Sequence, residues 1–303
     1  MMENITTKSA PFKVKRNKDI RFGRVGLYAT LILYTLFLMI PFYTIIISAF
    51  VDHAELDSAL NFIWWPKTFS LQGFKNLVEY DVMYYETGIP SIVLGFFNTL
   101  WITCVPTLVG LFVSGLAAYV YAKIKLPGKN VIFAIEMATM MIPLGSMQVV
   151  SYLFYNAILG WNDTPLPLVI PGLFGSASLI FFLRTYFEGI NNEILEAARI
   201  DGKSVFGIYF TIMIPLAIPA FVAQFIFGFV GGYNDYVGPM LYLTGNKMMV
   251  TLQLAVANLQ NSFAKYPETI CASAVVSMIP LIIIYCISQK LFINGIAVGG
   301  GKE

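Results

Sequence analysis

The sequence predicts an all-α integral membrane protein with six transmembrane helices. Of its 303 residues, 57% are hydrophobic and only 12% are charged, whereas a soluble domain carries about 25% charged residues. The charged residues leave six uncharged runs of 20 residues or more, and about 20 apolar residues cross the hydrocarbon core of a bilayer as a helix. The runs lack the polar–apolar alternation of the strands in a membrane barrel. Lipid is therefore expected to be the main solvent of this chain.

The first membrane helix is expected at residues 25–50, after a basic N-terminal tail at 1–24. Its uncharged run is far longer than the apolar core of a cleaved signal peptide, so we expect the helix to remain in the protein. An external segment at 51–94 follows, which is acidic and contains Trp64 and Trp65. Because tryptophan favours the membrane interface, part of this segment is expected on the bilayer surface.

A core of five further helices is expected at residues 95–293, followed by a glycine-rich tail at 294–303. Each helix takes one of the remaining uncharged runs, and the third expected helix of the chain contains Pro143, which interrupts helical hydrogen bonding. The most polar internal stretch, at 188–210, separates the fourth helix from the fifth. The five helices of the core are expected near residues 95–122, 131–155, 166–187, 210–237 and 269–292.

The basic residues orient these helices. Placing the N-terminal tail in the cytoplasm assigns 15 of the 19 Lys and Arg residues to cytoplasmic segments and four to external segments. Cytoplasmic loops of membrane proteins carry such an excess of Lys and Arg. Both termini and the stretch 188–210 are therefore expected on the cytoplasmic side. Orientation alone accounts for the basic tail, so no nucleic-acid partner is expected.

The residues that build catalytic and metal sites are sparse. His53 is the only histidine and follows the first helix, where we expect a solvated loop residue. Cys104, Cys271 and Cys286 all fall within apolar runs, as small core residues do, whereas disulfides need paired cysteines in an oxidising compartment. The sequence has no zinc-hydrolase motif and no nucleophile elbow. It therefore predicts a chain that is not an enzyme and holds no metal or cofactor of its own.

A short helix is expected to stand out of the cytoplasmic stretch 188–210. Asn191 or Asn192 suits its first position, because an Asn side chain accepts a hydrogen bond from the free amides of a first turn. Ile194, Ala197 and Ala198 form one apolar face of this helix. Gly202 ends the helix, and Ser204 can cap the helix that follows. The alternative is an amphipathic helix that lies flat on the membrane.

The triplet Gly202-Lys203-Ser204 does not complete a nucleotide site. A phosphate-binding loop has the spacing GxxxxGK[ST] and follows a β-strand. Its first glycine would fall at position 197, where the chain has Ala197, and no strand is expected before it. A process driven by ATP would therefore depend on another subunit.

The stretch from Glu196 to Pro215 resembles the EAA loop of binding-protein-dependent ABC importer permeases. The shared pattern is Glu-Ala-Ala, three residues, Gly, nine residues and Ile-x-hydrophobic-Pro, with Ile214 where the family usually has Leu. The residues concerned, including the acid before the glycine, are Glu196, Ala197, Ala198, Asp201, Gly202, Ile212 and Pro215. The resemblance implies that this loop couples the membrane helices to a separate ATPase.

Further segments resemble the shorter, six-helix subunit of the maltose-type carbohydrate importers, and the resemblance covers residues 40–303. The segments stand in the family's order and are Met140–Pro143, Leu159–Thr164, Phe181–Phe187, Ile200–Gly202, Asn234–Pro239 and Gln289–Gly301. The chain departs from the family at Asn191 and Asn192, where a proline is common, and at Tyr233, where a tryptophan often stands.

The resemblance implies a transmembrane subunit that carries a carbohydrate, an oligosaccharide, inward across the cytoplasmic (inner) membrane of a bacterium or archaeon. The implied partners are a second permease subunit, two ATPase subunits, an extracytoplasmic solute-binding protein and the lipid bilayer. ATP and Mg²⁺ would be held by the ATPase. One alternative is an ABC permease for a peptide, an amino acid or an anion. Another is an ATP-independent secondary transporter, which would need intramembrane acids such as Glu136 and Asp235.

Two groups of residues are candidates for contact with the solute and with its binding protein. Asn234, Asp235 and Tyr236 form a polar and aromatic cluster of a kind that binds sugars; alternatively, the acid braces the end of the fifth helix. Within the external segment 239–268, the stretch Asn258–Glu268 resembles a loop that reaches into the binding protein in the maltose-type family, with a solvated connector as the alternative. Its hydrogen-bonding residues are Asn258, Gln260, Asn261 and Ser262.

Overall fold

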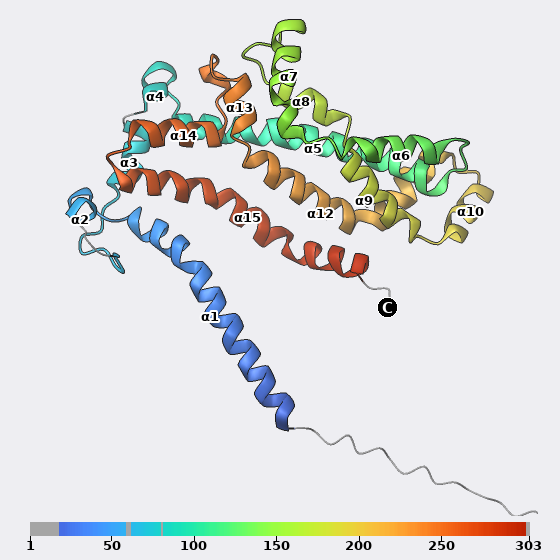
Figure 1. The fold of residues 1–303 in the computed structure, drawn as a ribbon, viewed down its shortest axis with the longest axis horizontal. Coiled ribbons are helices and arrows are strands. Elements are labelled where there is room, and N and C mark those ends of the chain that lie inside the picture. The colour runs from blue at the N-terminus through green and yellow to red at the C-terminus, as the bar shows by residue number, and fades with distance from the viewer. Residues whose placement is uncertain (1–17, 59–61, 80, 301–303) are drawn as a thin grey trace, which may run out of the picture.

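The computed structural model describes residues 18–58, 62–79 and 81–300. Within these ranges the regular structure is helical, apart from a single bridge between Val51 and Phe69. The long helices are α1 (Lys18–Ser48), α5 (Ser91–Lys123), α12 (Ile214–Tyr233) and α15 (Pro267–Gly300). Helix α12 packs between α5 and α15 along the length of the molecule, whereas α1 projects away from the bundle (Figure 1). The all-α prediction is confirmed for the described chain.

Shorter elements cap the two ends of this bundle. Helices α2 (His53–Ser58), α3 (Gln72–Glu79) and α4 (Val82–Thr87) lie at one end, and α10 (Asn192–Ile200) lies at the other (Figure 1). The remaining elements are α6 (Lys129–Thr139), η1 (Leu144–Met147), α7 (Gln148–Leu153), η2 (Phe154–Ile158), α8 (Leu166–Leu173), α9 (Ala177–Glu188), α11 (Val205–Ile208), η3 (Tyr209–Met213), α13 (Val237–Tyr242), η4 (Lys247–Met249) and α14 (Leu252–Ser262).

Five helical stretches of the described residues are long and apolar enough to cross a membrane. Each of them overlaps one of the six helices expected from the sequence. The stretches are Val25–Ser48, Ser91–Lys123, Leu166–Glu188, Val205–Tyr233 and Pro267–Gln289. The remaining expected helix, at residues 131–155, is not continuous.

The break in that helix lies between α6 and η1. Pro143 has no N–H group to continue a helix, and its ring pushes the preceding residue toward extended backbone. The amides of Met140, Met141 and Ile142 bond to carbonyls three residues earlier, which tightens the last turn of α6 and ends it. Pro106, in contrast, lies inside the continuous helix α5. A proline alone therefore did not reveal which helix would break.

The segment expected as an external connector, 239–268, is largely folded. It contains most of α13, all of η4 and all of α14. Helix α14 packs against both α5 and α15, and Leu252, Val256 and Leu259 bury its inner side. Asn258–Ser262 therefore lie on the last turns of a helix and not in an open loop.

Both terminal helices extend into the expected tails. Helix α1 begins at Lys18, within the stretch 1–24, and residues 1–17 lie outside the described part of the chain. Helix α15 continues to Gly300, within the stretch 294–303, and residues 301–303 lie outside it as well.

Two glycines let α12 lie directly against α5. A Cβ atom added to Gly228 would lie 2.8 Å from the methyl group of Thr107. A Cβ atom added to Gly232 would lie 2.7 Å from the methyl group of Thr103. These distances are shorter than real Cβ contacts. The glycines lie one helical turn apart, which is the small-residue spacing that brings membrane helices close together.

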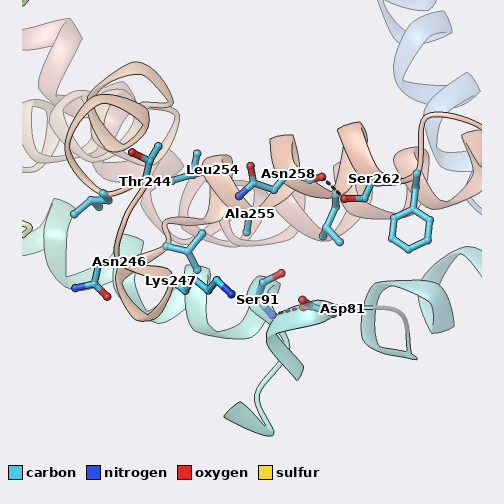
Figure 2. Close-up of a pocket in the computed structure, with 13 residues that line it drawn as sticks. Asp81, Ser91, Thr244, Asn246, Lys247, Leu254, Ala255, Asn258 and Ser262 are labelled. Atoms are coloured by element: carbon cyan, nitrogen blue, oxygen red, sulfur yellow. Dashed lines mark hydrogen bonds between the residues drawn. The ribbon is translucent and has the colours of Figure 1, made fainter. Parts of the chain in front are cut away.

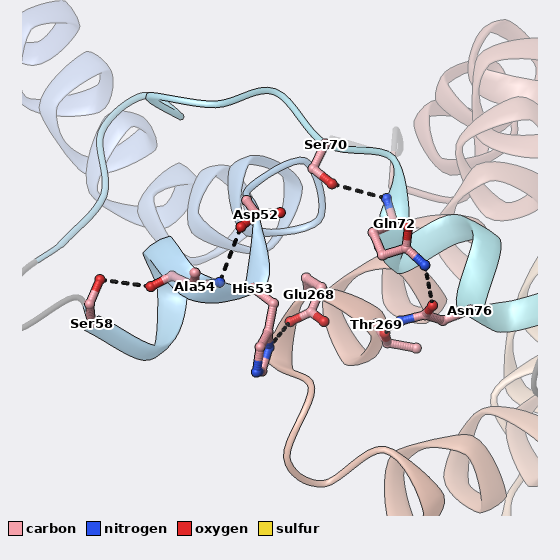
Figure 3. Close-up of polar contacts among 9 residues, drawn as sticks. All are labelled: Asp52, His53, Ala54, Ser58, Ser70, Gln72, Asn76, Glu268 and Thr269. Carbon is pink, nitrogen blue, oxygen red and sulfur yellow. Dashed lines mark hydrogen bonds and ion pairs between the residues drawn. The ribbon is translucent and has the colours of Figure 1, made fainter.

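A polar cluster fastens the segment after α1 to the start of α15 (Figure 3). The side chain of Glu268 is 1% exposed, and its Oε2 lies 3.1 Å from Nδ1 of His53. Beside this pair, Asn76 donates a hydrogen bond to the hydroxyl of Thr269 over 2.9 Å and accepts one from Gln72 over 2.8 Å. His53 is therefore not in a loop: it begins α2 and pairs with Glu268, while its side chain stays 40% exposed.

Candidate functional site

The short helix expected in the stretch 188–210 is present as α10, with the caps that its sequence indicates. The side chain of Asn191 accepts a hydrogen bond from the amide of Glu193 over 3.0 Å. At the other end, the amide of Lys203 donates to the carbonyl of Ala198 over 3.0 Å, and Gly202 takes a φ of +80°. This is the left-handed turn that glycine forms without strain.

The inner face of α10 differs from the one expected. Leu195 and Ala198 are buried against the core of the bundle, whereas Ala197 is exposed and Ile194 is 45% exposed. Ile200 is 87% exposed. The sequence alone did not show that the side of the helix with Leu195 packs against the bundle. As a result, α10 presents an outward surface that is partly apolar.

The EAA residues do not all lie together. Glu196, Ala197, Asp201 and Gly202 are exposed on α10 and the turn after it. Pro215 lies in the first turn of α12, after the π-helical turn η3. Only the residues on α10 and its turn therefore belong to the outward surface.

Lys123 is a residue of this region that sequence reasoning missed. From the end of α5 its Nζ donates to the carbonyl of Ile190 over 2.6 Å and to Oδ1 of Asn192 over 2.8 Å. The contact ties the start of α10 to α5. A lysine in the last turn of a helix suggests an interaction with free carbonyl groups, but the sequence gives no sign of which carbonyls it meets.

A pocket of about 440 Å³ opens on the surface of the bundle between α5, α8, α9 and α12. Its polar lining consists of hydroxyl groups, one amide and one carboxylate, contributed by Thr99, Thr103, Thr107, Ser176, Ser178, Thr251, Gln224 and Asp235. The buried hydroxyl of Thr251 has no hydrogen-bond partner among the described residues. Such a lining offers hydrogen bonds to a polar ligand with little charge.

Of the three residues in the expected substrate cluster, Asp235 is the one that lines this pocket. Its Oδ1 also accepts a hydrogen bond from the amide of Gly238 over 3.1 Å, so it braces the chain between α12 and α13. Asn234 donates to the carbonyl of Val230 over 2.9 Å. Tyr236 is 36% exposed.

A second pocket, of about 270 Å³, lies beside α14 (Figure 2), at the end of the bundle opposite α10 (Figure 1). Asn258 and Ser262 line it from α14, facing Asp81 and Ser91. Gln260 and Asn261 are exposed on the same helix but are not part of this lining. At its edge, Lys247 pairs with Glu86 over 2.7 Å. The four residues expected to meet a binding protein therefore share one helix, and two of them face this pocket.

The chain is similar to known transport proteins over nearly its whole length. Residues 20–298 match the family model described as "Binding-protein-dependent transport system inner membrane component". Arabinooligosaccharides transport system permease protein AraQ of Bacillus subtilis (strain 168) is 29% identical over 92% of this chain and 96% of its own length. Inner membrane ABC transporter permease protein YcjP of Escherichia coli (strain K12) is 27% identical over 92% of this chain and 97% of its own.

Solved structures share the fold. A chain in the crystal structure of a bacterial ABC transporter involved in the import of the acidic polysaccharide alginate superposes with a TM-score of 0.77 and 22% identity, covering 93% of this chain and 100% of that one. With its family model matched from residue 20 to residue 298 and five helices fit to span a membrane, the chain belongs to the binding-protein-dependent transport system inner membrane component family.

Proposed function

We propose that this chain is the permease subunit of an ABC importer that carries an oligosaccharide into the cell. The observation that supports this most strongly is the set of relatives, whose names include arabinooligosaccharide and diacetylchitobiose transporters and, among solved structures, an alginate importer. The pocket between α5, α8, α9 and α12 also supports such a solute, because the hydroxyl and amide groups in its lining can bond to sugar hydroxyls.

The proposed topology has six membrane crossings and both termini in the cytoplasm. The stretch from α6 to η2 supplies the crossing that is interrupted at Pro143. Helix α10 then faces the cytoplasm, and α2, α3, α4 and α14 face the outside. The 15-to-4 distribution of Lys and Arg supports this orientation.

The outward surface of α10 is proposed to dock on an ATPase subunit. Glu196 and Ile200 are both exposed and lie one helical turn apart, on the same side of α10. We infer that this charged side chain and the 87% exposed Ile200 meet the ATPase. ATP and Mg²⁺ belong to that subunit. Closure of two such subunits would move α10, and the motion would pass to α5 and α12 through the shared core.

At the external end, α14 and the pocket beside it are proposed to meet a solute-binding protein. A chain of a bacterial alginate ABC transporter, solved in complex with an alginate pentasaccharide-bound periplasmic protein, shares the fold of this chain with a TM-score of 0.58 and 16% identity. The exposed amides and hydroxyl of Asn258, Gln260, Asn261 and Ser262 supply hydrogen-bonding groups for that contact. A second permease subunit would complete the pathway.

Reconstitution tests the proposed function. The tagged chain is purified from its native membranes with whatever subunits accompany it and is placed in proteoliposomes. We expect oligosaccharide uptake that requires both ATP inside the vesicle and a binding protein on the opposite face. Uptake without ATP would indicate a secondary transporter. ATP-dependent uptake of peptides, amino acids or anions, with none of oligosaccharides, would reject the substrate class.

A further inference from the structure

Among the described residues that line the pocket between α5, α8, α9 and α12, Asp235 alone is charged. Its carboxylate takes part in none of the ion pairs of the described chain. The negative charge of Asp235 therefore acts on whatever enters the pocket, without a neighbouring cation to offset it.

A second lining residue, Thr251, holds a hydroxyl group that the fold does not use. Thr251 directly precedes α14, where a threonine hydroxyl commonly accepts a hydrogen bond from the first turn of the helix. Its side chain makes no such bond, and the amide of Leu252 donates to the hydroxyl of Thr99 instead, over 2.8 Å. Thr251 is 3% exposed, and its hydroxyl has no partner among the described residues. Because an unpaired buried hydroxyl is costly, this group points to a partner that enters the pocket.

The rest of the polar lining is uncharged, and an aromatic ring lies beside it. Hydroxyl groups come from α5 and from the start of α9, and Gln224 adds an amide from α12. Phe227, three residues further along the same helix, is 55% exposed and also lines the pocket. Sites for small molecules combine such apolar and aromatic walls with a few polar groups, in volumes of about 300–1,000 Å³. The 440 Å³ of this pocket falls in that range.

This lining favours a neutral sugar over an acidic one. A uronic acid carries a carboxylate on its sugar ring, and like charges that come close in a partly buried site repel each other. A neutral sugar offers hydroxyl groups, and the hydrogen bonds that a carboxylate accepts from them are stronger than those between neutral groups. The carboxylate is also held in place, because its Oδ1 accepts from the amide of Gly238 over 3.1 Å.

We propose that this pocket contacts the transported saccharide and that Asp235 is a specificity-determining residue, which admits neutral oligosaccharides and rejects those made of uronic acids. The inference rests on the proposed function and narrows its substrate class. The similar proteins leave this choice open, since AraQ is named for arabinooligosaccharides whereas the alginate importer takes an acidic polysaccharide.

The test measures the binding of labelled saccharides to the purified complex of this chain and its partner subunits, without a binding protein. Selectivity then comes from the membrane complex alone. The neutral probes are arabinotriose, diacetylchitobiose and maltotriose. Each is paired with the uronate obtained by oxidising its primary hydroxyl groups, so the two members of a pair differ mainly in charge. We expect at least one neutral probe to bind the wild type, and its uronate to bind roughly tenfold more weakly or worse.

Asp235→Asn assigns this selectivity to the chain itself. The variant keeps an oxygen for the amide of Gly238 but loses the charge, so the affinity for the uronate should approach the affinity for its neutral partner. Asp163→Asn is the matched control. The carboxylate of Asp163 accepts from the amide of Gly245 over 2.7 Å in the same way but does not line the pocket, so this variant should keep the selectivity of the wild type.

Thr251→Val tests the unpaired hydroxyl separately. Valine keeps the shape of the side chain, so the empty complex should melt no lower than the wild type, because no hydrogen bond within the protein is lost. Binding of the neutral probe should weaken roughly threefold to tenfold. Unchanged binding with a lower melting temperature would show that the hydroxyl serves the fold and not a ligand.

Equal binding of a uronate and its neutral partner to the wild type, or selectivity that Asp235→Asn leaves unchanged, would overturn the inference. It would also be overturned if no neutral probe bound a complex that takes up oligosaccharide with ATP and its binding protein, and the proposed function would then stand. A complex that takes up no oligosaccharide under those conditions would instead overturn the proposed function, and this inference with it.

Discussion

Single side chains fix the position of α10 on the bundle. The caps at Asn191 and Ser204 are local features, and the sequence indicated both of them because an Asn or Ser before a helix accepts from its first amides. The contact made by Lys123 joins residues that are 67 and 69 positions apart, and no local pattern encodes such a pairing. For the same reason, nothing in the sequence indicated that His53 pairs with Glu268, which is 215 positions away.

Gly202 is expected to be intolerant of a β-branched residue. Its φ of +80° costs a side chain about 1–2 kcal/mol, so Gly202→Val should distort the turn after α10. Asparagine enters this conformation more easily, so Gly202→Asn is the matched control. We expect Gly202→Val to insert into the membrane normally but to retain little ATPase in a pull-down. Recovery of the ATPase at wild-type yield, with unchanged uptake, would contradict this expectation.

Replacing Lys123 should loosen the start of α10. Lys123→Met keeps the apolar stem but loses the hydrogen bonds to Ile190 and Asn192. Hydrogen bonds to charged groups contribute about 1.5–3 kcal/mol, and partial exposure reduces that value here. The expected result is weaker stimulation of ATPase activity by binding protein. Lys125→Met, at an exposed neighbouring position, serves as the control. If both variants weakened the stimulation of ATPase activity equally, the hydrogen bonds of Lys123 would not be what holds the start of α10.

Asp235 should contribute to stability through its hydrogen bond to Gly238. Asp235→Ala removes the acceptor and is expected to lower the stability of the complex by about 1 kcal/mol. Asp235→Asn keeps an amide oxygen in the same place and should retain most of that stability. Thermal unfolding of the complex measures the difference. Equal melting temperatures for the two variants would show that Asp235 does not brace the chain.

At the level of helices, the sequence predicted best where uncharged runs are long and uninterrupted. The ends of α5 at Lys123 and of α9 at Glu188 follow from composition and flanking charges. The gap between α8 and α9, in contrast, falls inside one expected helix. The sequence marked Pro143 as an interruption but left open whether the helix would break there, because Pro106 and Pro143 look alike in the sequence while only one of them ends a helix. Helix α14 was missed because its buried face becomes visible only when α5 and α15 are placed beside it.

The attachment of α2 and α3 to α15 should depend on pH. The hydrogen bond to Glu268 raises the pKa of His53 above its usual 6.5, with smaller contributions in the same direction from Asp57 and Asp52. Because the pKa of His53 is higher in the folded state than in the unfolded state, the His53–Glu268 pair contributes its full stabilisation below about pH 6.5. That stabilisation is lost as the pH rises through the folded-state pKa of His53. Hydrogen exchange in α2 and α3 should therefore be slower at about pH 6 than at about pH 8, after correction for intrinsic rates.

The matched variant for this prediction is His53→Gln. Glutamine still donates a hydrogen bond to Glu268 but does not titrate, so the pH dependence should disappear. Wild-type protection that does not change with pH would show that the pair does not hold this end of the molecule.

The two ends of the molecule carry different kinds of surface feature. One end carries α10 (Figure 1), and the other carries the pocket beside α14 (Figure 2) and the His53–Glu268 pair (Figure 3). A pocket with both apolar and hydroxyl-bearing residues in its lining opens between α5, α8, α9 and α12. The all-helical fold was predictable from composition, whereas the pockets were not, because their walls come from segments far apart in the sequence.

The accessibility of a cysteine at position 200 tests whether α10 lies on the cytoplasmic side of the membrane and docks on an ATPase. The residues Cys104, Cys271 and Cys286 are first replaced by serine or alanine, and Ile200→Cys is then labelled with a membrane-impermeant thiol reagent. Because Ile200 is 87% exposed, the new thiol should react readily wherever nothing covers it. We expect labelling only from the cytoplasmic face, and protection of the thiol when the ATPase is bound. Labelling from the outside, or labelling that the bound ATPase leaves unchanged, would contradict it.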